Sequence, residues 1–264
     1  MNNRPKISII TVCYNAEKDI EKTILSVINQ TYDKVEYIVV DGGSCDKTMT
    51  IINRYAYKID KIVSEPDNGI YDAMNKGIKL ASGKWLNFMN AGDTFVNNLV
   101  IDEVVSCIDD DDIITGIAVT PKYNWMPFAK GDLSLFKLYH YGISHQASFI
   151  KRALFEKMLF DDKYKIASDC KFFLYQLIFN HVTYNPIYVK ICYFDNSGIS
   201  SNHENAYKEL DEIFEEFLPK EALIDYKYFG RLSNPFIIKM LPIFNSRVMN
   251  VIRNFLRKIK YCCR

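Results

Sequence analysis

Residues 5–32 read PKISIITVCYNAEKDIEKTILSVINQTY, and this stretch decides the fold. Lys6 to Val12 is a β-rich apolar run without strict polar alternation, which is typical of a strand buried on both faces of a parallel sheet. From Ala16 to Gln30 the apolar side chains fall on one helical stripe, with most of the charges outside it. The stretch therefore predicts a strand followed by a helix.

The same alternation of strand and helix continues along the first 119 residues. We expect further strands over Val35 to Val40, Lys61 to Val63, Trp85 to Met89 and Asp112 to Val119. Between them we expect helices over Lys47 to Tyr55, Ile70 to Ala81 and Leu99 to Ile108. Strands joined by crossover helices form a parallel sheet, and ligands bind at the carboxyl ends of its strands. The predicted fold class is α/β, with a Rossmann-like, mostly parallel sheet and flanking helices.

The pattern changes after residue 119. Thr120 to Ser144 is aromatic, punctuated by Pro and Gly and too long for an ordinary connector, so we interpret it as a substrate loop. Periodicity resumes over Ala147 to Met158 and Asp169 to Asn180. A strand-like run over Val182 to Phe194 and an acidic helix around Asn205 to Phe217 follow.

Composition favours a globular protein of the cytoplasm. The 264 residues are 48% hydrophobic, which is enough to bury a full core, and the formal net charge of +1 argues against a protein devoted to nucleic acid. Seven cysteines without a CxxC pair fit a reducing compartment. We expect no secretory leader, because the first residues lack its features, and no apolar window is long enough for a spanning helix.

The segment 235–264 carries seven basic residues and no acidic ones, interleaved with apolar residues at near-helical spacing. A cationic amphipathic helix of this kind can lie on an anionic leaflet. We therefore expect residues 235–264 to contact the inner face of the cytoplasmic membrane. The alternative is a closing helix that packs on the core and leaves its basic face in solvent.

Two loops after predicted strands carry side chains suited to a nucleotide. The first contains Tyr14 and Asn15 and lacks the GxGxxG turn that a dinucleotide site needs. The Tyr14 ring suits stacking on a base, although a lone loop tyrosine is more often packed against its neighbours. The second loop begins at Asp41, whose carboxylate can accept hydrogen bonds from a ribose or a base. Ser44 or Asp46 can cap the helix that follows.

Acidic and amide side chains also follow the third and fourth predicted strands. Asp72, Asn75 and Lys76 fall one helical turn apart and can face one site together. The fourth strand runs into Asn90-Ala91-Gly92-Asp93, which carries a carboxylate into a tight glycine turn. Hard divalent cations take one or two carboxylates together with substrate phosphates, so Asp93 is well placed to bind Mn²⁺ or Mg²⁺. An Asx-turn or a helix cap is the alternative for Asp93.

Taken in order, these segments resemble the family 2 glycosyltransferases of the GT-A fold, in particular bacterial colanic-acid and capsular-polysaccharide sugar transferases. Further matching stretches are SEPDNGIYDAMNKGIKLASGKWLNFMNAGD, HQASFI and KIASDCKFF. Their order and spacing are more specific than any single motif. The resemblance implies inverting transfer from a nucleoside diphosphate sugar to a glycan hydroxyl, with a lipid-linked acceptor in surface polysaccharide synthesis. It also implies a donor-binding half over 1–119, an acceptor-binding and catalytic half of the same GT-A domain over 120–200, and a helical extension over 201–264.

The resemblance assigns roles to individual residues as well. Nucleotide-binding roles fall on Thr11, Tyr14, Asn15, Glu17, Asp41 and Asp72. The metal-binding motif falls on Asp93, with Asn90 standing where many relatives carry an acid, and a late histidine that some relatives use as a further metal ligand falls on His203. His145 and Gln146 fall on the acceptor side.

Asp169 matches the position of the family's general base. Inverting transfer needs one base to deprotonate the acceptor hydroxyl as it attacks the anomeric carbon. The alternative for Asp169 is an N-cap of the helix that follows it.

Two other interpretations stay open. Asn90 and the basic segment 235–264 fit a non-catalytic, nucleotide-sugar-binding subunit at the membrane. A methyltransferase or another Rossmann enzyme shares the alternating pattern, but the missing glycine-rich first loop disfavours it.

Overall fold

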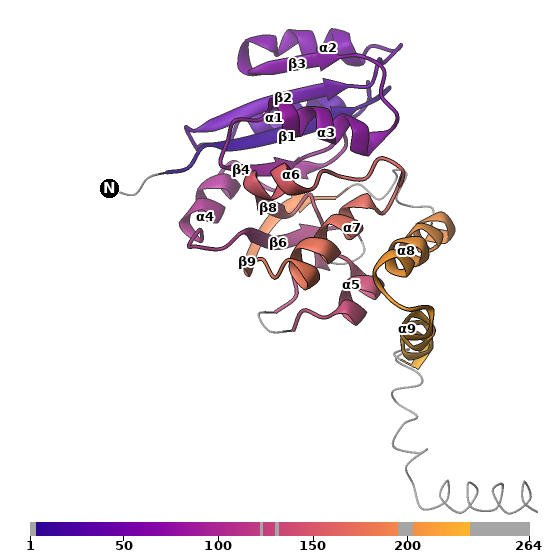
Figure 1. Cartoon of the computed structure of the whole chain (residues 1–264). Coiled ribbons are helices and arrows are strands. Elements are labelled where there is room, and N and C mark those ends of the chain that lie inside the picture. Colours follow the sequence, from indigo (N-terminus) through magenta and orange to yellow (C-terminus); the bar gives the residue numbers. More distant parts are fainter. Residues whose placement is uncertain (1–3, 122–123, 130–131, 195–202, 233–264) are drawn as a thin grey trace, which may run out of the picture. The chain divides into compact units, whose positions relative to one another are not determined.

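The computed structural model describes residues 4–121, 124–129, 132–194 and 203–232 (Figure 1). The chain forms two compact units, Met1–Ile213 and Phe214–Arg264. All the residues with predicted site roles belong to the first unit, which is described first.

The described strands are β1 (Ile7–Cys13), β2 (Val35–Asp41), β3 (Lys61–Ser64), β4 (Trp85–Phe88), β5 (Thr94–Phe95), β6 (Ile113–Val119), β7 (Asn124–Trp125), β8 (Ser148–Lys151) and β9 (Tyr184–Tyr193). The α-helices of this unit are α1 (Ile20–Ile28), α2 (Thr48–Arg54), α3 (Ile70–Leu80), α4 (Val100–Ser106), α5 (Leu135–Tyr141), α6 (Ala153–Lys157), α7 (Ser168–Leu174) and α8 (His203–Phe217), which runs into the second unit. A short 3₁₀ turn, Ala56–Lys58, follows α2, and α7 continues as one π-helical turn, Tyr175–Phe179.

These strands form one sheet in the order β3-β2-β1-β4-β8-β6-β9-β5, with β7 paired to β6. β1 pairs in parallel with both β2 and β4, and Ile7 lies opposite Val35 and Trp85. β8 is antiparallel to β4 and to β6, whereas β6 and β9 are parallel. Six of the nine described strands therefore run in one direction, and the predicted mostly parallel α/β fold is confirmed.

Helices pack on both faces of the parallel half of the sheet. They are needed there because successive side chains of β1 point to opposite faces and all of them are buried. Ile7 and Ile9 join a core with Ile20 and Ile24 of α1 and with apolar residues of α2 and α4. On the other face α3 packs against β1 and β2. A Cβ on Gly77 of α3 would fall 2.4 Å from Ile10, so only glycine lets the helix approach this closely.

Two predictions for the second half need correction. The periodic stretch 147–158 is not one element, because Ser148–Lys151 pairs with β4 and β6 before α6 begins. The stretch 120–144 is not only a loop, because it contains β7 and α5. Ser134 caps α5 by accepting a hydrogen bond from the N–H of Lys137 at 3.2 Å.

The second unit contributes the end of α8 and helix α9 (Lys220–Leu232) to the described residues. Within the described ranges, none of the helices has the length and apolar character needed to cross a membrane. The basic segment 235–264, for which membrane contact is predicted, lies outside the described residues.

Candidate active site

The candidate site is built on the carboxyl ends of β1, β2 and β4. After β4 ends, the N–H groups of Met89 and Ala91 donate to the carbonyls of Ile10 and Val12. The main chain therefore continues beside β1 as far as the turn Asn90–Asp93. This pairing brings the turn next to the loop that follows β1.

Reciprocal hydrogen bonds join the loops after β1 and β2. The N–H of Asn15 donates to Ser44 Oγ at 2.8 Å, and Asn15 Oδ1 accepts from the N–H of Cys45 at 2.9 Å. Glu17 Oε2 accepts from the N–H of Lys47 at 3.0 Å. Asn15 has a φ of 48°, a left-handed conformation that asparagine adopts more readily than most residues. Asn15 and Glu17 thus shape the rim of the candidate site, and their contact with a nucleotide stays a prediction.

Asp41 and Thr11 are completely buried beneath these loops. Asp41 accepts hydrogen bonds from the N–H of Ser44 at 3.0 Å and from the hydroxyl of Ser64 at 2.7 Å. The hydroxyl of Thr11 donates to the carbonyl of Met89 at 2.7 Å. Both side chains therefore hold the loops in place through protein contacts, and their predicted contact with a base or ribose remains a prediction.

Tyr14 and Asp67 both lie beside Gly42, in the loop after β2. The Tyr14 side chain is exposed at 63%, so its ring is available for stacking. A Cβ on Gly42 would fall 2.3 Å from Asp67 Oδ2 and 3.4 Å from the Tyr14 ring. The Asp67 carboxylate is anchored by the N–H of Gly69, which donates to Oδ1 at 2.8 Å. Asp67 belongs to the stretch beginning SEPDNG that carries the family resemblance, but the role that its position suggested was capping of the helix that follows.

Asp72, Asn75 and Lys76 do not share one face, which corrects the grouping expected from their spacing. Asp72 turns back to accept from the N–H of Asn68 at 3.0 Å and lies 3.7 Å from the Lys76 ammonium. Asn75 is buried and exchanges hydrogen bonds with the main chain of Phe160 at 2.8 and 3.0 Å. Asn75 therefore ties α3 to the segment between α6 and α7, and of the three only Asp72 and Lys76 border the loop before α3.

Thr23 of α1 fixes the turn that contains Asp93. Its Oγ1 accepts from the N–H of Gly92 at 3.0 Å and donates to the carbonyl of Asp93 at 2.8 Å. Asp93 is exposed at only 4%. In the same turn Asn90 Oδ1 is buried without a hydrogen-bond partner in the described part of the chain, which costs about 1–3 kcal/mol.

The residues of this turn fit a divalent cation. A carboxylate and an unpartnered carboxamide oxygen are the hard oxygen groups that Mn²⁺ and Mg²⁺ prefer. Within the described ranges no three His, Cys, Asp or Glu side chains gather into a group that could hold a metal. The coordination would thus rely on oxygens from the donor's diphosphate, as Mg²⁺ sites commonly do.

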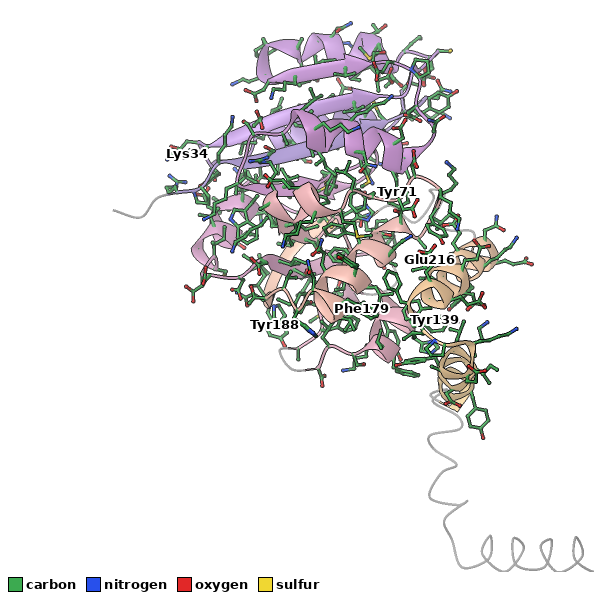
Figure 2. The ribbon with its side chains drawn as sticks, viewed as in Figure 1. Lys34, Tyr71, Tyr139, Phe179, Tyr188 and Glu216 are labelled. Atoms are coloured by element: carbon green, nitrogen blue, oxygen red, sulfur yellow. The ribbon has the colours of Figure 1, made fainter. Side chains whose placement is uncertain are left out.

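Asp169 lies in the first turn of α7, where three groups approach its carboxylate. Oδ2 is 2.7 Å from His145 Nδ1, and Oδ1 is 2.9 Å from both the hydroxyl of Tyr71 and the N–H of Cys170. Tyr71, labelled in Figure 2, comes from α3. Burial and the charge of Asp169 raise the pKa of Tyr71 well above its usual value, so the phenol keeps its proton and can donate it. Asp169 is not the N-cap of α7, because Ala167 occupies that position.

His145 connects Asp169 to the turn after β4. Its other ring nitrogen, Nε2, lies 3.1 Å from Nδ2 of Asn90. The contact arises because His145 precedes β8, which runs antiparallel to β4, and Asn90 follows β4. Gln146 is also buried, but its Oε1 accepts from the hydroxyl of Ser144 at 3.0 Å. His145 thus reaches the candidate site, whereas Gln146 supports the segment that carries it.

Glu209 of α8 holds the main chain that leads into Asp169. Its carboxylate accepts from the N–H groups of Lys165, Ile166 and Ala167 at 2.9, 2.8 and 2.9 Å. The N–H of Ala167, the N-cap of α7, has no partner inside that helix, and the N–H groups of Lys165 and Ile166 belong to the segment just before it. No motif predicted this role, since Glu209 lies 42 to 44 positions beyond the residues it holds. His203, the predicted further metal ligand, begins α8, and its side chain lies outside the described residues.

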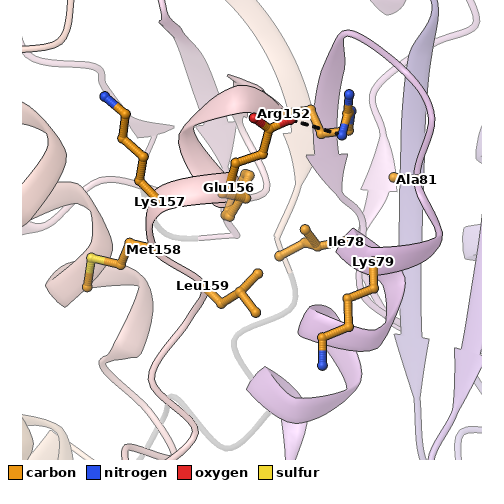
Figure 3. Close-up of a pocket in the computed structure, with 9 residues that line it drawn as sticks. Ile78, Lys79, Ala81, Arg152, Glu156, Lys157, Met158 and Leu159 are labelled. Carbon is orange, nitrogen blue, oxygen red and sulfur yellow. Dashed lines mark hydrogen bonds and ion pairs between the residues drawn. The ribbon is translucent and has the colours of Figure 1, made fainter.

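A cavity of about 420 Å³ lies away from these groups, between the end of α3 and α6 (Figure 3). Its lining includes Ile78, Phe155 and Arg152, whose guanidinium turns to Glu156 at 3.3 Å. The N–H of Arg152 donates to the carbonyl of Lys84, just before β4 begins. The cavity is therefore at the amino end of β4, and none of the predicted site residues lines it.

Comparison with known proteins identifies the family of this chain. The model of the family described as glycosyl transferase family 2 matches residues 8–175, which contain the loops after β1, β2 and β4 and also Asp169. An uncharacterised glycosyltransferase of Mycobacterium tuberculosis is 31% identical over 216 residues, covering 77% of this chain and 80% of that protein.

Solved structures show the same fold at lower identity. Residues 1–349 of S. aureus TarS in complex with UDP-GlcNAc align with a TM-score of 0.66 at 19% identity, covering 93% of this chain and 77% of that one. The mannosyltransferase PcManGT from Pyrobaculum calidifontis, in complex with GDP-Man and Mn²⁺, aligns with a TM-score of 0.65 at 17% identity, covering 97% and 80%. The chain therefore belongs to glycosyl transferase family 2, and its fold is that of the GT-A glycosyltransferases.

Proposed function

We propose that this chain transfers a sugar, with inversion at the anomeric carbon, from a nucleoside diphosphate sugar to a hydroxyl of a glycan acceptor. One observation supports the proposal above all. The turn Asn90–Asp93, on the donor side, is joined through His145 to Asp169, the carboxylate at the position of the general base. Groups for the donor and for the acceptor hydroxyl therefore lie in one connected cluster.

Asp169 acts as the general base in this proposal. Its side chain keeps 12% of its surface exposed, so an acceptor hydroxyl can reach it, while Tyr71 and His145 hold it in position. Asp169 takes the hydroxyl proton as the acceptor oxygen bonds to the anomeric carbon. The bond from that carbon to the diphosphate oxygen breaks, and its electron pair leaves with the nucleoside diphosphate. Attack opposite the leaving group inverts the configuration.

The nucleoside of the donor lies against Tyr14 and the loop after β2. The exposed ring of Tyr14 stacks on the base, and the Asp67 carboxylate offers an acceptor for a base N–H. Asn15, Glu17, Asp41 and Asp72 shape this pocket through the loop contacts described above. The UDP-GlcNAc and GDP-Man complexes of TarS and PcManGT support a nucleotide-sugar donor.

Asp93 binds Mn²⁺ or Mg²⁺ together with the donor's diphosphate, and Asn90 Oδ1 is a second oxygen in the same turn. When bound, such a cation stabilises the negative charge that develops on the leaving diphosphate. The Mn²⁺ complex of PcManGT supports the choice of cation.

We propose a lipid-linked acceptor at the inner face of the cytoplasmic membrane, in the synthesis of a bacterial surface polysaccharide. The basic amphipathic composition of residues 235–264 supports this. Liposome sedimentation of the full chain, with and without anionic lipid, tests it. Replacing Arg253, Arg257 and Lys260 with glutamate should abolish binding to anionic vesicles, and unchanged sedimentation of this variant would contradict the membrane contact.

A screen of nucleoside diphosphate sugars for donor hydrolysis and transfer, with Mn²⁺ or with a chelator, tests the function itself. We expect turnover of one donor class that requires the cation and is lost in Asp93→Ala. The same variant should lose the cation-dependent part of nucleotide binding in calorimetry. Nucleotide binding without turnover on any donor or lipid-linked acceptor would favour a non-catalytic subunit instead.

A further inference from the structure

Three buried side chains form a continuous line between the donor side and the acceptor side. Asn90 Nδ2 lies 3.1 Å from His145 Nε2, and His145 Nδ1 lies 2.7 Å from Asp169 Oδ2. Asn90 belongs to the turn that ends at Asp93, while Asp169 begins α7. The imidazole ring of His145 therefore contacts both Asn90 on the donor side and Asp169 on the acceptor side.

The chemistry of the three groups determines which group donates and which accepts in each hydrogen bond. An ionised carboxylate only accepts hydrogen bonds, so His145 must carry its proton on Nδ1 to bond with Asp169. In the neutral ring Nε2 is then an acceptor, and Asn90 must present its NH₂ group to it. Each donor therefore points the same way, from Asn90 through His145 to Asp169.

This direction also fixes the carboxamide of Asn90. With Nδ2 committed to His145, Asn90 Oδ1 is turned away from the ring, and it is the buried oxygen that has no partner within the described residues. If the amide were reversed, its oxygen would face Nε2, and that nitrogen would need a proton, either instead of the one on Nδ1 or in addition to it. In the neutral ring, the tautomer that serves Asp169 is thus the one that leaves Asn90 Oδ1 for the donor side.

We propose that His145 is a positioning residue that serves both substrates: its Nδ1–H orients the Asp169 carboxylate, and its Nε2 orients Asn90 for the donor and its cation. The inference rests on the proposed function. His145 itself takes no proton from the acceptor, because Asp169 occupies one ring nitrogen and Asn90 the other.

Two conservative variants separate the two contacts. Asparagine places an amide near the position of Nδ1, so His145→Asn should keep the bond to Asp169 and lose the one to Asn90. Glutamine reaches the position of Nε2, so His145→Gln should keep the contact with Asn90 and lose the one to Asp169. His145→Ala loses both. His181→Asn is a matched control, because His181 is exposed and has a φ of 51° that asparagine also adopts.

The readouts are kcat for transfer and the Kd of the nucleoside diphosphate with Mn²⁺, measured by calorimetry without acceptor. We expect His145→Ala to lower kcat about tenfold to a hundredfold and to weaken Mn²⁺-dependent nucleotide binding. His145→Asn should recover kcat but not Kd, and His145→Gln should recover Kd but not kcat. Thermal unfolding of each variant identifies any that fails to fold.

A double-mutant cycle with Asp169→Asn gives an independent check on the contact with the base. If His145 acts on kcat through Asp169, removing it from the Asp169→Asn protein should cost little further activity. Fully additive losses would overturn that part of the proposal. A variant His145→Asn as slow as His145→Ala would make the imidazole itself the reacting group. A wild-type chain without turnover would contradict the proposed function, whereas the Kd measurements would still test the contact with Asn90.

Discussion

Glu36 and Asp169 are both buried carboxylates in contact with a polar cluster. Glu36 lies near the amino ends of the parallel strands, whereas Asp169 lies near their carboxyl ends. Glu36 is exposed at 3% beside the amino end of β1, where it accepts from the hydroxyl of Ser8 and from both the N–H and the hydroxyl of Ser82. Lys6 and Lys61 each lie 3.2 Å from its Oε1. Both oxygens of the Glu36 carboxylate therefore have partners supplied by the fold itself.

The cluster around Asp169, near the carboxyl ends of the strands, is less completely hydrogen-bonded. Asp169 is bonded to Tyr71 and His145, yet the same line of contacts ends in an oxygen of Asn90 that has no partner in the described part of the chain. A saturated cluster lowers the free energy of the folded chain, whereas an unsaturated one costs stability until a ligand completes it. The difference separates a carboxylate whose cluster is completed by the fold from the one that we propose as the general base.

The largest effect should come from Asp169→Asn. The amide cannot accept the acceptor proton, so we expect kcat to fall about 10²–10⁴-fold. Because asparagine keeps an oxygen for His145, the melting temperature should stay near that of the wild type. Transfer assays beside thermal unfolding measure both, and substantial activity in this variant would remove Asp169 as the base.

Glu36→Gln should show the opposite pattern, with activity per folded molecule kept and stability lost. Burial alone raises the pKa of Glu36, but hydrogen bonds from Ser8, Ser82 and Lys61 outweigh it and lower the pKa to about 2. A shift of about two units is worth about 3 kcal/mol, and we expect denaturant unfolding at pH 7 to show a loss of about 2–3 kcal/mol.

The direction of the pKa shift decides how the stability lost in Glu36→Gln varies with pH. A carboxyl group whose pKa is lowered by folding stabilises the chain above its unfolded pKa of about 4.3, and the contribution disappears as the pH falls through about 2. The stability difference between wild type and Glu36→Gln should therefore shrink between about pH 5 and pH 2. A difference that stays constant with pH would mean that packing, not charge, is responsible.

Replacing one glycine by alanine at each end of the parallel strands sharpens the comparison further. A Cβ on Gly83 would fall 2.6 Å from the backbone nitrogen of Ser8, so Gly83→Ala should cost about 1–3 kcal/mol of stability. A Cβ on Gly42 would clash with the end of the Asp67 side chain, which can move aside, and would make ordinary contact with the Tyr14 ring at 3.4 Å. We expect Gly42→Ala to alter nucleotide affinity and leave the unfolding midpoint nearly unchanged. Equal losses of stability in the two variants would contradict this.

The smallest expected effect belongs to Tyr14→Ala. The ring is exposed and contributes little to the fold, but it offers a stacking surface for a base. Nucleotide affinity should fall about tenfold, equivalent to about 1.4 kcal/mol, with no change in thermal stability. Calorimetry with UDP and GDP would measure it, and unchanged affinity for both would place the base elsewhere.

The sequence allowed the parallel half of the fold to be predicted closely. Mostly apolar, β-rich runs such as Ile7–Cys13 and Val35–Asp41 are buried on both faces, so their own composition marks them as strands. Ser148–Lys151 could not be recognised in this way, because its strand character comes from pairing with β4 and β6. Short segments are assigned by their partners, and a single sequence does not show partners.

The candidate site follows the same rule. Family motifs marked Asp93, His145 and Asp169 one by one, and the structure brings His145 and Asp169 into contact although 24 positions separate them. Neither the contact of His145 with Asn90 nor the place of Asp67 beside Gly42 follows from spacing along the chain. Such contacts depend on how loops from different strands meet.

The bonds from Glu209 to the start of α7 set a limit on where this enzyme can be divided. The family match ends at residue 175, yet the N–H groups of residues 165–167 are satisfied from α8. A chain cut at the end of the family match would keep the proposed base and lose the carboxylate that anchors its segment. The smallest unit that can be transplanted into a chimera, or compared meaningfully between relatives, therefore extends at least to residue 209.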